Sequence, residues 1–498
     1  MQIEVLTVII AYMLAVLIIG LYAAKYVKSV KDYLIYGHRM GIIPLTFTYF
    51  ATYLSAVSVF GFTGLVYRSG WSGLWLPIIW ATGSIMGMFI ALRLRRVKLT
   101  SPHEYFRVRF GLPSSFQIFA GLLTVVALLV SLIVQIRAMG ITWSLALNRS
   151  IEEGILISMV IVLIYTVVGG LYAVAYTDIF QGALFTAVLI GGGIWALSVM
   201  GGLENLYAMA AKITTPPTVG ASPTPEGLLV SAMGAYTFVG LIFLWLNWAP
   251  GVAAHIRYTQ RQLAAKNIDY SLKMYVIAWP ILFLIYVCMG LTALAGRVLI
   301  PTMPAGMSVD HIMPLLFLKY MPPIITGLLY GGLLAAAMST VDSEVQICNS
   351  IIFVDAQKYL KLSEKAMLNI ARILGVIIVV IATLITLYPL PIIIEFSAYS
   401  WGILGSLYFA PMLIGLYWRR VNKWGVLAGV FGGLIVFATW QLLWGTRIYG
   451  IPPFGVGVLV SIVLTIVVSA VTKPPPEEYL KDYFPPPITV KAEKAEKA

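Results

Sequence analysis

Polar side chains are concentrated in one otherwise apolar stretch, residues 331–350, which reads GGLLAAAMSTVDSEVQICNS. Four of its residues are three or four positions apart, so a helix would place them on one face with a carboxylate beside it. These four are Ala336, Ser339, Thr340 and Ser343, and the carboxylate is Asp342. Hydroxyl and carboxylate oxygens inside a membrane suit a small hard cation. The alternative is that the hydroxyls bond to their own helix and join it to its neighbours.

A second apolar stretch, residues 48–70, carries small and hydroxylic residues at three-residue steps. These are Ser55, Ser58, Gly61 and Gly64 in TYFATYLSAVSVFGFTGLVYRSG. One interpretation is close packing of two helices, for which small residues are commonly used. The other is a helix that breaks near its middle, whose freed carbonyl groups can bind an ion.

Arg137 lies midway along a third apolar stretch, LIVQIRAMGITWSLAL at 132–147. A guanidinium at this depth costs several kcal/mol unless it faces a partner or a wet cavity. Its planar fork suits a carboxylate, which could belong to the protein or to a substrate. A fourth stretch has a proline that removes a backbone donor, which indicates an interrupted helix or a simple kink. Its marked residues are Trp245, Asn247, Trp248, Pro250 and Gly251.

These residues require elements that cross a membrane. The chain of 498 residues is 60% hydrophobic and 11% charged, with a mean hydropathy of +0.92, which excludes a soluble globular protein. Apolar runs of about 20 residues recur along it, each long enough to span a bilayer. We expect an all-α integral membrane protein with one polytopic domain, residues 1–472, and thirteen spans. They are predicted at 4–24, 44–66, 72–93, 116–146, 153–168, 176–199, 230–254, 272–296, 322–352, 368–389, 393–417, 424–444 and 453–472.

Basic residues predict the orientation. Most of the 33 Lys and Arg residues fall in one set of alternating loops and in the segment after residue 472. The positive-inside rule then places the N-terminus outside and residues 473–498 in the cytoplasm, where a Pro-rich, charged composition predicts disorder. We therefore expect the basic side chains of the inner loops, Arg257 and Arg261 included, at the membrane interface. Nucleic acid is excluded as a partner by this distribution.

The sequence has no motif of an enzyme or of an ATP-driven pump. It contains no P-loop, no glycine-rich nucleotide fingerprint and no GxSxG turn, and its four histidines have no metal-binding spacing. Cys288 and Cys348 both lie in apolar runs, which does not indicate a disulfide framework. We expect a protein that is not an enzyme and has no cofactor.

Four stretches in order resemble the sodium:solute symporter family. They are IYTVVGGLYAVAYTDIFQG (164–182), HIRYTQRQLAAKN (255–267), AAAMSTVDS (335–343) and FAPMLIGLYWRRVNKWGVLAG (409–429). The resemblance implies a LeuT-type inverted repeat of five plus five helices, with one extra helix before it and two after it. It also implies alternating access around a site near the membrane midplane.

The resemblance implies a sodium site made of neutral oxygens. Carbonyl groups of Leu54, Val57 and Ala336 and the hydroxyls of Ser339 and Thr340 match the family's positions. A second cation site, known in part of the family, would map onto Asp178, Asp342 and Ser343, together with Ser339. Two carboxylates replace a hydroxyl-rich set there, so Asp178 could instead be structural or linked to a proton.

Arg137 and Trp143 resemble a pattern of carboxylate-binding relatives, in which the arginine holds the acid of the substrate. We expect the solute to contact Ser55, Ser58 and Arg137, with Trp143, Trp245, Trp248 and Tyr399 as apolar walls. The prediction is a monomeric symporter of the cell membrane that couples Na⁺ to a small organic carboxylate, such as a monocarboxylate, proline or a pantothenate-like acid. The alternatives are a proton-coupled carrier that uses Asp178 or Asp342, and a passive uniporter or channel.

Overall fold

The computed structural model describes residues 3–25, 39–94, 97, 99, 102–166, 170–359, 363–444 and 453–484. This described part is helical, and its only β-type pairings are two isolated bridges, Met40 with Ala265 and Thr218 with Met303. The principal helices are α1 (Ile3–Ala24), α3 (Ile42–Tyr53), α4 (Phe62–Ser69), α5 (Trp75–Leu94), α6 (Tyr105–Phe110), α7 (Ser114–Leu147), α8 (Ile151–Thr166), α9 (Gly170–Met200), α10 (Leu203–Ala211), α11 (Phe238–Ala254), α12 (Ile256–Ala264), α13 (Ile268–Leu299), α14 (Ile312–Tyr320), α15 (Pro323–Tyr359), α16 (Glu364–Thr386), α17 (Ile393–Leu404), α18 (Gly415–Tyr417), α19 (Lys423–Trp444) and α20 (Pro453–Val471).

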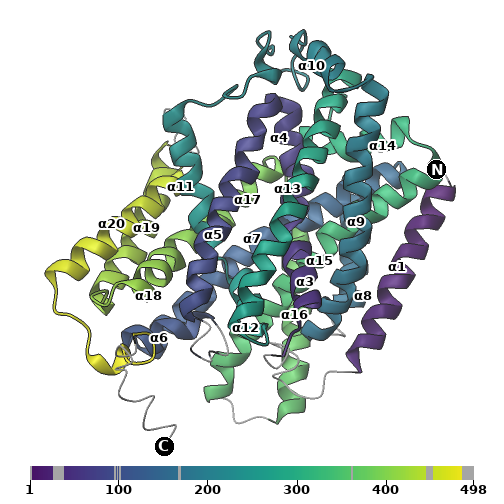
Figure 1. The fold of residues 1–498 in the computed structure, drawn as a ribbon. Coiled ribbons are helices and arrows are strands. Elements are labelled where there is room, and N and C mark those ends of the chain that lie inside the picture. Colours follow the sequence, from purple (N-terminus) through teal and green to yellow (C-terminus); the bar gives the residue numbers. More distant parts are fainter. Residues whose placement is uncertain are drawn as a thin grey trace, which may run out of the picture.

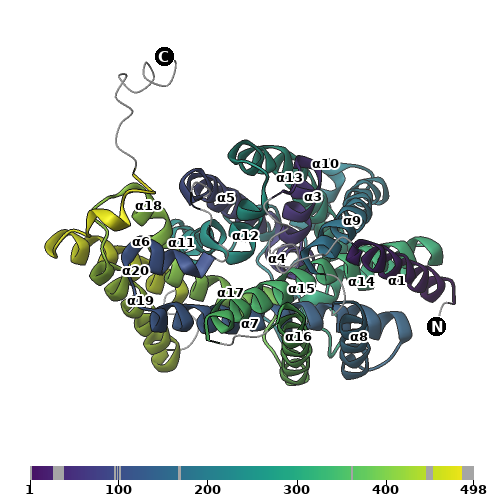
Figure 2. The same cartoon turned by 90° about the horizontal axis from the view of Figure 1, so that it is seen from below.

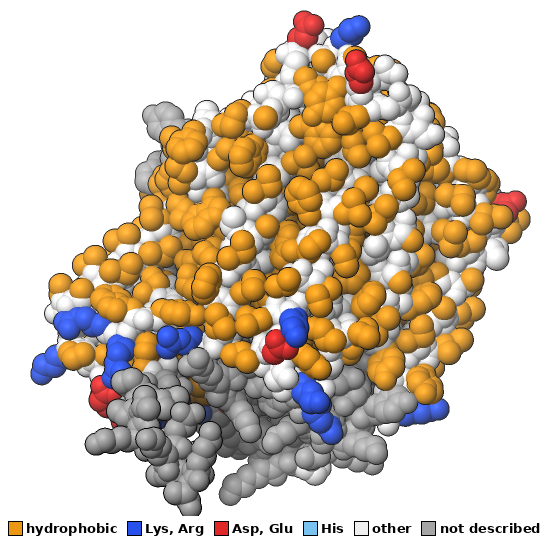
Figure 3. All heavy atoms as spheres, viewed as in Figure 1, with side chains coloured by type: hydrophobic (Ala, Val, Ile, Leu, Met, Phe, Trp, Pro, Cys, Tyr) orange, Lys and Arg blue, Asp and Glu red, His pale blue; other side chains and the backbone are white. Residues whose placement is uncertain are grey.

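Ten helical stretches of the described residues are long and apolar enough to cross a membrane. This number is below thirteen because α4 and α5 form one continuous stretch, Val57–Leu94, and because α8 and the apolar part of α16 are shorter than 18 residues. Each of the thirteen predicted spans overlaps a helix, but the number of crossings stays a prediction. Hydrophobic side chains cover the face in Figure 3, between charged side chains at its two ends.

Helix α15, 37 residues long, runs through the middle of the bundle and packs against α7, α9, α1 and α3 (Figure 1). Helix α1 lies at one edge of the bundle, against α15 and α9. The pair α19 and α20 lies at the opposite edge, where α20 packs against α11 (Figure 2). The first helix and the last two therefore flank the central bundle from two sides.

The stretch 48–70 is a broken helix, as one of the two interpretations predicted. Helix α3 ends at Tyr53, Leu54 has φ −84° and ψ 82°, and a π-helix, η2 (Val57–Gly61), leads into α4. Two side chains satisfy backbone groups freed by the break: the Ser58 hydroxyl donates to the Tyr53 carbonyl at 2.8 Å, and Gln135 of α7 accepts from the Ala56 N–H at 2.8 Å. The break is thus held by hydrogen bonds from within the chain and from another helix.

The close-packing interpretation also holds, further along the same stretch. A Cβ at Gly61 would lie 3.1 Å from the backbone nitrogen of Ile394 at the start of α17. A Cβ at Gly64 would lie 3.2 Å from the Asp310 carboxylate, in the short 3₁₀ helix η6 (Val309–His311). The small face therefore combines a break at Ser55 with close contact at its two glycines.

A second break separates α11 from α12, but it is not at the proline. Helix α11 continues through Pro250 and ends at Ala254, and His255 is extended, with φ −62° and ψ 128°. The His255 ring nitrogen Nδ1 then accepts from the Arg257 N–H, at 3.4 Å, at the start of α12. Pro250 removes only one backbone donor, so the helix continues past it. The extended conformation of His255, in contrast, ends the helix.

Small residues one turn apart join α19 to α20. Gly425, Gly429 and Gly433 of α19 face Ser469, Thr465 and Ser461 of α20. A Cβ at Gly429 would lie 2.7 Å from the Ser461 carbonyl oxygen and would also collide with the Thr465 hydroxyl. The two helices can therefore approach this closely only because these positions have no side chain.

The predicted disorder of residues 473–498 is wrong for their first part. Leu480 and Tyr483 are buried, and the Arg93 guanidinium donates to the Tyr483 carbonyl at 3.0 Å. The rings of Tyr105 and Tyr483 lie edge to face, 5.6 Å apart. Apolar side chains within this charged segment thus dock it on α6. Residues 485–498 lie outside the described part of the chain.

Candidate functional site

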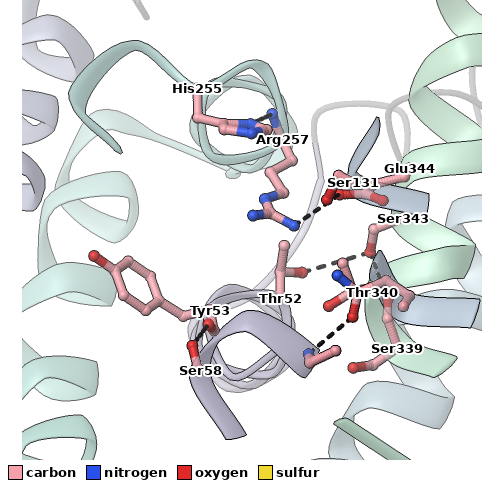
Figure 4. Close-up of polar contacts among 12 residues, drawn as sticks. Thr52, Tyr53, Ser58, Ser131, His255, Arg257, Ser339, Thr340, Ser343 and Glu344 are labelled. Atoms are coloured by element: carbon pink, nitrogen blue, oxygen red, sulfur yellow. Dashed lines mark hydrogen bonds and ion pairs between the residues drawn. The ribbon is translucent and has the colours of Figure 1, made fainter. Parts of the chain in front are cut away.

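The two segments predicted to hold sodium lie side by side (Figure 4). The Ser339 hydroxyl on α15 is 3.2 Å from the Ala51 carbonyl oxygen, in the last turn of α3, and 3.2 Å from the Ala336 carbonyl oxygen. The Thr340 hydroxyl donates to the same Ala336 oxygen at 3.4 Å. Ala336, Ser339 and Thr340 are fully buried, so this face of α15 points toward the broken helix and away from lipid.

Leu54 and Val57, the other predicted ligands, lie at the break itself. Leu54 is the residue at which α3 leaves the helical conformation, and Val57 begins η2. The Val57 carbonyl accepts from the Phe62 N–H, which is a π-helical bond. The Ala51 carbonyl was missed by sequence reasoning, because its role depends on how α3 and α15 are aligned and not on a residue type.

The second candidate cation site contains a protein cation. Arg261 of α12 donates from Nη2 to the Ser343 hydroxyl at 2.6 Å and to the Thr48 hydroxyl at 3.4 Å. Thr48 donates in turn to Asp178 Oδ2 at 2.5 Å. Asp342 is also buried and is an electrostatic neighbour of Tyr12 of α1. The structure therefore brings Asp178 and Ser343 together through Arg261 and Thr48.

A buried ion pair lies beside this site. Arg257 Nη1 donates to Glu344 Oε1 at 2.9 Å, and the Ser131 hydroxyl of α7 donates to the same oxygen at 2.5 Å (Figure 4). The two side chains of the pair are 1% and 0% exposed. All nine residues of α12 are buried, so its two arginines connect it to α3 and α15 inside the protein.

The expectation that Arg257 and Arg261 lie at the membrane interface is therefore wrong. Both are buried because buried carboxylates, Glu344 and Asp178, offset their charge. Arg109, a further basic residue between two predicted spans, is also buried and donates to the carbonyl groups of Gly415 and Val421.

The predicted substrate residues are not all in one place. Ser58 is buried, where its hydroxyl lies 3.0 Å from the Tyr286 hydroxyl. Arg137 is half-buried on α7, with the carboxylates of Asp310 and Glu152 as electrostatic neighbours. Trp245 donates to Thr82, at 2.8 Å. Trp248 and Tyr399 come together at a cavity, described next, which Ser55, Ser58, Arg137, Trp143 and Trp245 do not line.

A cavity of about 610 Å³ lies between the end of α4 and the beginnings of α17 and α20. It is lined by Trp248, Tyr399 and polar side chains, of which Arg68 and Glu395 form an ion pair at 3.2 Å. Two further lining residues, Asn247 and Gln441, each have a buried side-chain oxygen that accepts no hydrogen bond from the described residues. The cavity can thus hold a small solute and offers it both apolar walls and hydrogen-bond acceptors.

Asp310 and His311, which lie between the candidate membrane spans, have opposite pKa shifts. Burial raises the pKa of Asp310 to about 7, although the Ile393 N–H and Arg137 oppose this. Burial lowers the pKa of His311 to about 4. Between about pH 4 and 6.5, the raised pKa of Asp310 makes the free energy of unfolding fall as pH rises. Over the same range, the lowered pKa of His311 makes the free energy of unfolding rise with pH. Each group contributes a slope of up to about 1.4 kcal/mol per pH unit.

We therefore expect these two pH dependences of stability largely to cancel in the wild type. In Asp310→Asn, only the pH dependence that His311 causes should remain. The apparent melting temperature of the purified variant in detergent should rise more steeply between pH 4.5 and 6.5 than that of the wild type. Asp269→Asn, at a half-exposed ion pair with Lys273, is the matched control and should keep the wild-type profile. Parallel profiles of Asp310→Asn and wild type would contradict the assignment.

Comparison with known proteins gives consistent matches over most of the chain. The sequence model of the sodium:solute symporter family matches residues 33–433. The osmoregulated proline transporter OpuE of Bacillus subtilis (strain 168) is 27% identical over 490 residues, which cover 95% of this chain and 96% of that protein. A sodium/proline symporter of Staphylococcus aureus (strain JH9) is 24% identical over 488 residues, with 93% and 92% covered. These relatives are transporters and not enzymes.

Among solved structures, a Na⁺-coupled sialic acid symporter in a substrate-bound outward-open state superimposes with a TM-score of 0.76. Sequence identity is 18%, and the match covers 95% of this chain and 98% of that one. The likeness confirms the predicted fold, an all-α LeuT-type membrane transporter. It carries no information about the solute of this chain.

Proposed function

Because the chain belongs to the sodium:solute symporter family, we propose that it couples the inward movement of Na⁺ to the uptake of a small organic carboxylate, with proline as the first candidate. The proposal includes the predicted orientation, with the N-terminus outside, residues 473–484 in the cytoplasm, and the cell membrane as the location. Alternating access would occur between the two sides of the central bundle, with the single chain as the working unit.

The observation that carries the proposal is the contact between Ser339 and the Ala51 carbonyl group. A carbonyl oxygen of the broken helix and a hydroxyl of α15 thus lie 3.2 Å apart in the protein interior, and both are neutral. Neutral ligands suit a monovalent ion that must bind from one side and leave on the other. We propose Leu54, Val57, Ala336, Ser339 and Thr340 as the ligands, with the Ala51 carbonyl oxygen as a further candidate beside Ser339.

The solute is proposed from chemistry and from the relatives. Proline is the solute in the names of OpuE and the Staphylococcus symporter. In this chain, Trp248 and Tyr399 offer apolar surface in the cavity, and the free oxygens of Asn247 and Gln441 could accept hydrogen bonds from an ammonium group. Arg137 remains the proposed partner for a carboxylate, in the outer half of α7, so a solute would have to move from the cavity toward it.

The cavity is lined by residues at the end of α4, whereas all nine residues of α12 are buried. This arrangement supports an outward-facing state, into which Na⁺ and solute enter together. A membrane potential then adds about 2.3 kcal/mol per charge per 100 mV to uptake.

Uptake into proteoliposomes of the purified full chain tests the function. We expect labelled proline to accumulate against its gradient when Na⁺ is imposed outside. The same assay with lactate, acetate, pantothenate and a sugar would rank the solutes. Accumulation driven by a pH step without Na⁺ would favour the proton-coupled alternative, and equilibration without accumulation would favour a uniporter.

Ser339→Ala should raise the Na⁺ concentration for half-maximal uptake by about tenfold or more, equivalent to about 1.4 kcal/mol. The reason is the loss of one oxygen ligand, and Thr340→Ala should act in the same direction. Ser158→Ala is the matched control, because Ser158 is a buried serine of α8 that donates only to its own helix, at Gly154. An unchanged Na⁺ dependence in both site variants would remove the assigned ligands.

A further inference from the structure

Arg261 occupies the place at which a second cation would bind. Its guanidinium lies 2.6 Å from the Ser343 hydroxyl and is linked to Asp178 through Thr48. We propose that this guanidinium is the resident cation of the Asp178–Ser343 region, so that Na⁺ is excluded there and the chain binds a single Na⁺. The count of one rests on the sodium site of the proposed function, whereas the exclusion by Arg261 does not.

The first argument is the geometry of the contact. Arg261, Thr48, Asp178 and Ser343 are all buried, and they come from four different helices: α12, α3, α9 and α15. The Ser343 hydroxyl donates its hydrogen to the Ser339 carbonyl oxygen at 2.9 Å, and its oxygen accepts from Arg261 at 2.6 Å. The Thr52 hydroxyl lies 3.5 Å from the same oxygen. A Na⁺ ion that needed this hydroxyl as a ligand would have to displace the guanidinium.

The second argument is charge. Two buried carboxylates, Asp178 and Glu344, are matched by two buried guanidinium groups, Arg261 and Arg257. Another cation among them would add an uncompensated positive charge to a buried region, next to a guanidinium, where repulsion is weakly screened. Asp342 is a third buried carboxylate of this region, and Tyr12 of α1 is one of its electrostatic neighbours.

The third argument concerns the oxygen ligands that would remain if position 261 had a neutral side chain. Asp178 Oδ1 and Arg261 Nε are buried without a hydrogen-bond partner among the described residues. The carboxylate therefore has one free oxygen directed into the protein. Without the guanidinium, this oxygen and the hydroxyls of Thr48 and Ser343 would form a set of hard ligands that suits Na⁺.

The guanidinium is also fixed by its own helix. Arg261 Nη1 donates to the Arg257 carbonyl oxygen at 3.3 Å and to Gln260 Oε1 at 3.4 Å. Five donors on a planar, permanently charged group make this arrangement hard to replace with water. Arg261 is thus a specificity residue that sets how many ions accompany the solute.

Equilibrium binding of ²²Na⁺ to the purified full chain tests this without any solute. We expect one saturable Na⁺ per chain in the wild type and in Arg261→Lys, and one additional Na⁺ in Arg261→Gln. Adding Asp178→Asn to Arg261→Gln should remove the extra ion. Monodispersity on size exclusion checks that each variant is folded, and if Arg261→Gln is not, the wild-type count decides: one supports the proposal and two overturns it.

The results separate this proposal from the proposed function. Equal Na⁺ counts in wild type and folded Arg261→Gln overturn the role of Arg261, whatever the solute. No Na⁺ in the wild type but one in Arg261→Gln would support that role and would remove the sodium site at Ser339. Two Na⁺ ions in the wild type would leave the proposed function intact and overturn the inference.

Discussion

Glu344→Ala is expected to lower the free energy of unfolding by about 3–5 kcal/mol, because it leaves a buried guanidinium without a carboxylate. Arg257 is 1% exposed, so bulk water cannot take over the contact that Glu344 Oε1 makes at 2.9 Å. The Ser131 hydroxyl would lose its acceptor as well. The apparent melting temperature in detergent, or the midpoint of denaturation by SDS, measures the effect.

Glu477→Ala is the matched control for this change. Glu477 pairs with Arg419 at 2.8 Å, but the side chains of Arg419 and Glu477 are 51% and 77% exposed. An exposed pair contributes about 0–1 kcal/mol, so the control should behave nearly as the wild type does. A double variant, Arg257→Met with Glu344→Leu, should recover much of the lost stability, since it removes both charges. Equal losses in Glu344→Ala and Glu477→Ala would show that the buried pair is not the cause.

Gly429→Leu should separate α19 from α20 and cost about 1–3 kcal/mol or more. The new side chain would meet the Ser461 carbonyl oxygen, which belongs to the backbone and cannot rotate away. Loss of the contact should lower the apparent melting temperature. Proteolytic sensitivity of the residues around α20 should increase as well.

Gly191→Leu is the control for this substitution. Gly191 lies on α9, and a Cβ added there would have no atom within 4 Å, so the same residue change meets open space. We expect its melting temperature to remain close to that of the wild type. If both leucine variants melted alike, the close approach of α19 and α20 would not be important for stability.

The polar face of α15 could be predicted from the sequence because it is local. Ser339, Thr340 and Ala336 lie within five residues, and their spacing alone places them on one face of α15. The small and polar residues Ser55 and Ser58 also made a break in the second span one of two local interpretations. Both conclusions needed no knowledge of distant residues.

The environment of the arginines on α12 could not be predicted in this way. Arg257 pairs with a residue 87 positions away, and Arg261 contacts a serine 82 positions away. A sequence read by composition assigns a basic residue near the end of an apolar run to the interface. Only the packing of α12 against α3, α5, α13 and α15 shows that the charges are buried. The position of the second break, at His255 and not at Pro250, likewise depends on tertiary contacts.

The hydrogen bond between Ser339 and Ala51 has a consequence for the protein when no ion is bound. When an ion leaves a site built of bare carbonyl groups, the oxygens that held it would remain unpaired in the protein interior, which is costly. Here the Ser339 hydroxyl can donate to the Ala51 oxygen without any ion. At the proposed sodium site, an ion-free protein would therefore leave no unpaired acceptor at the Ala51 carbonyl group.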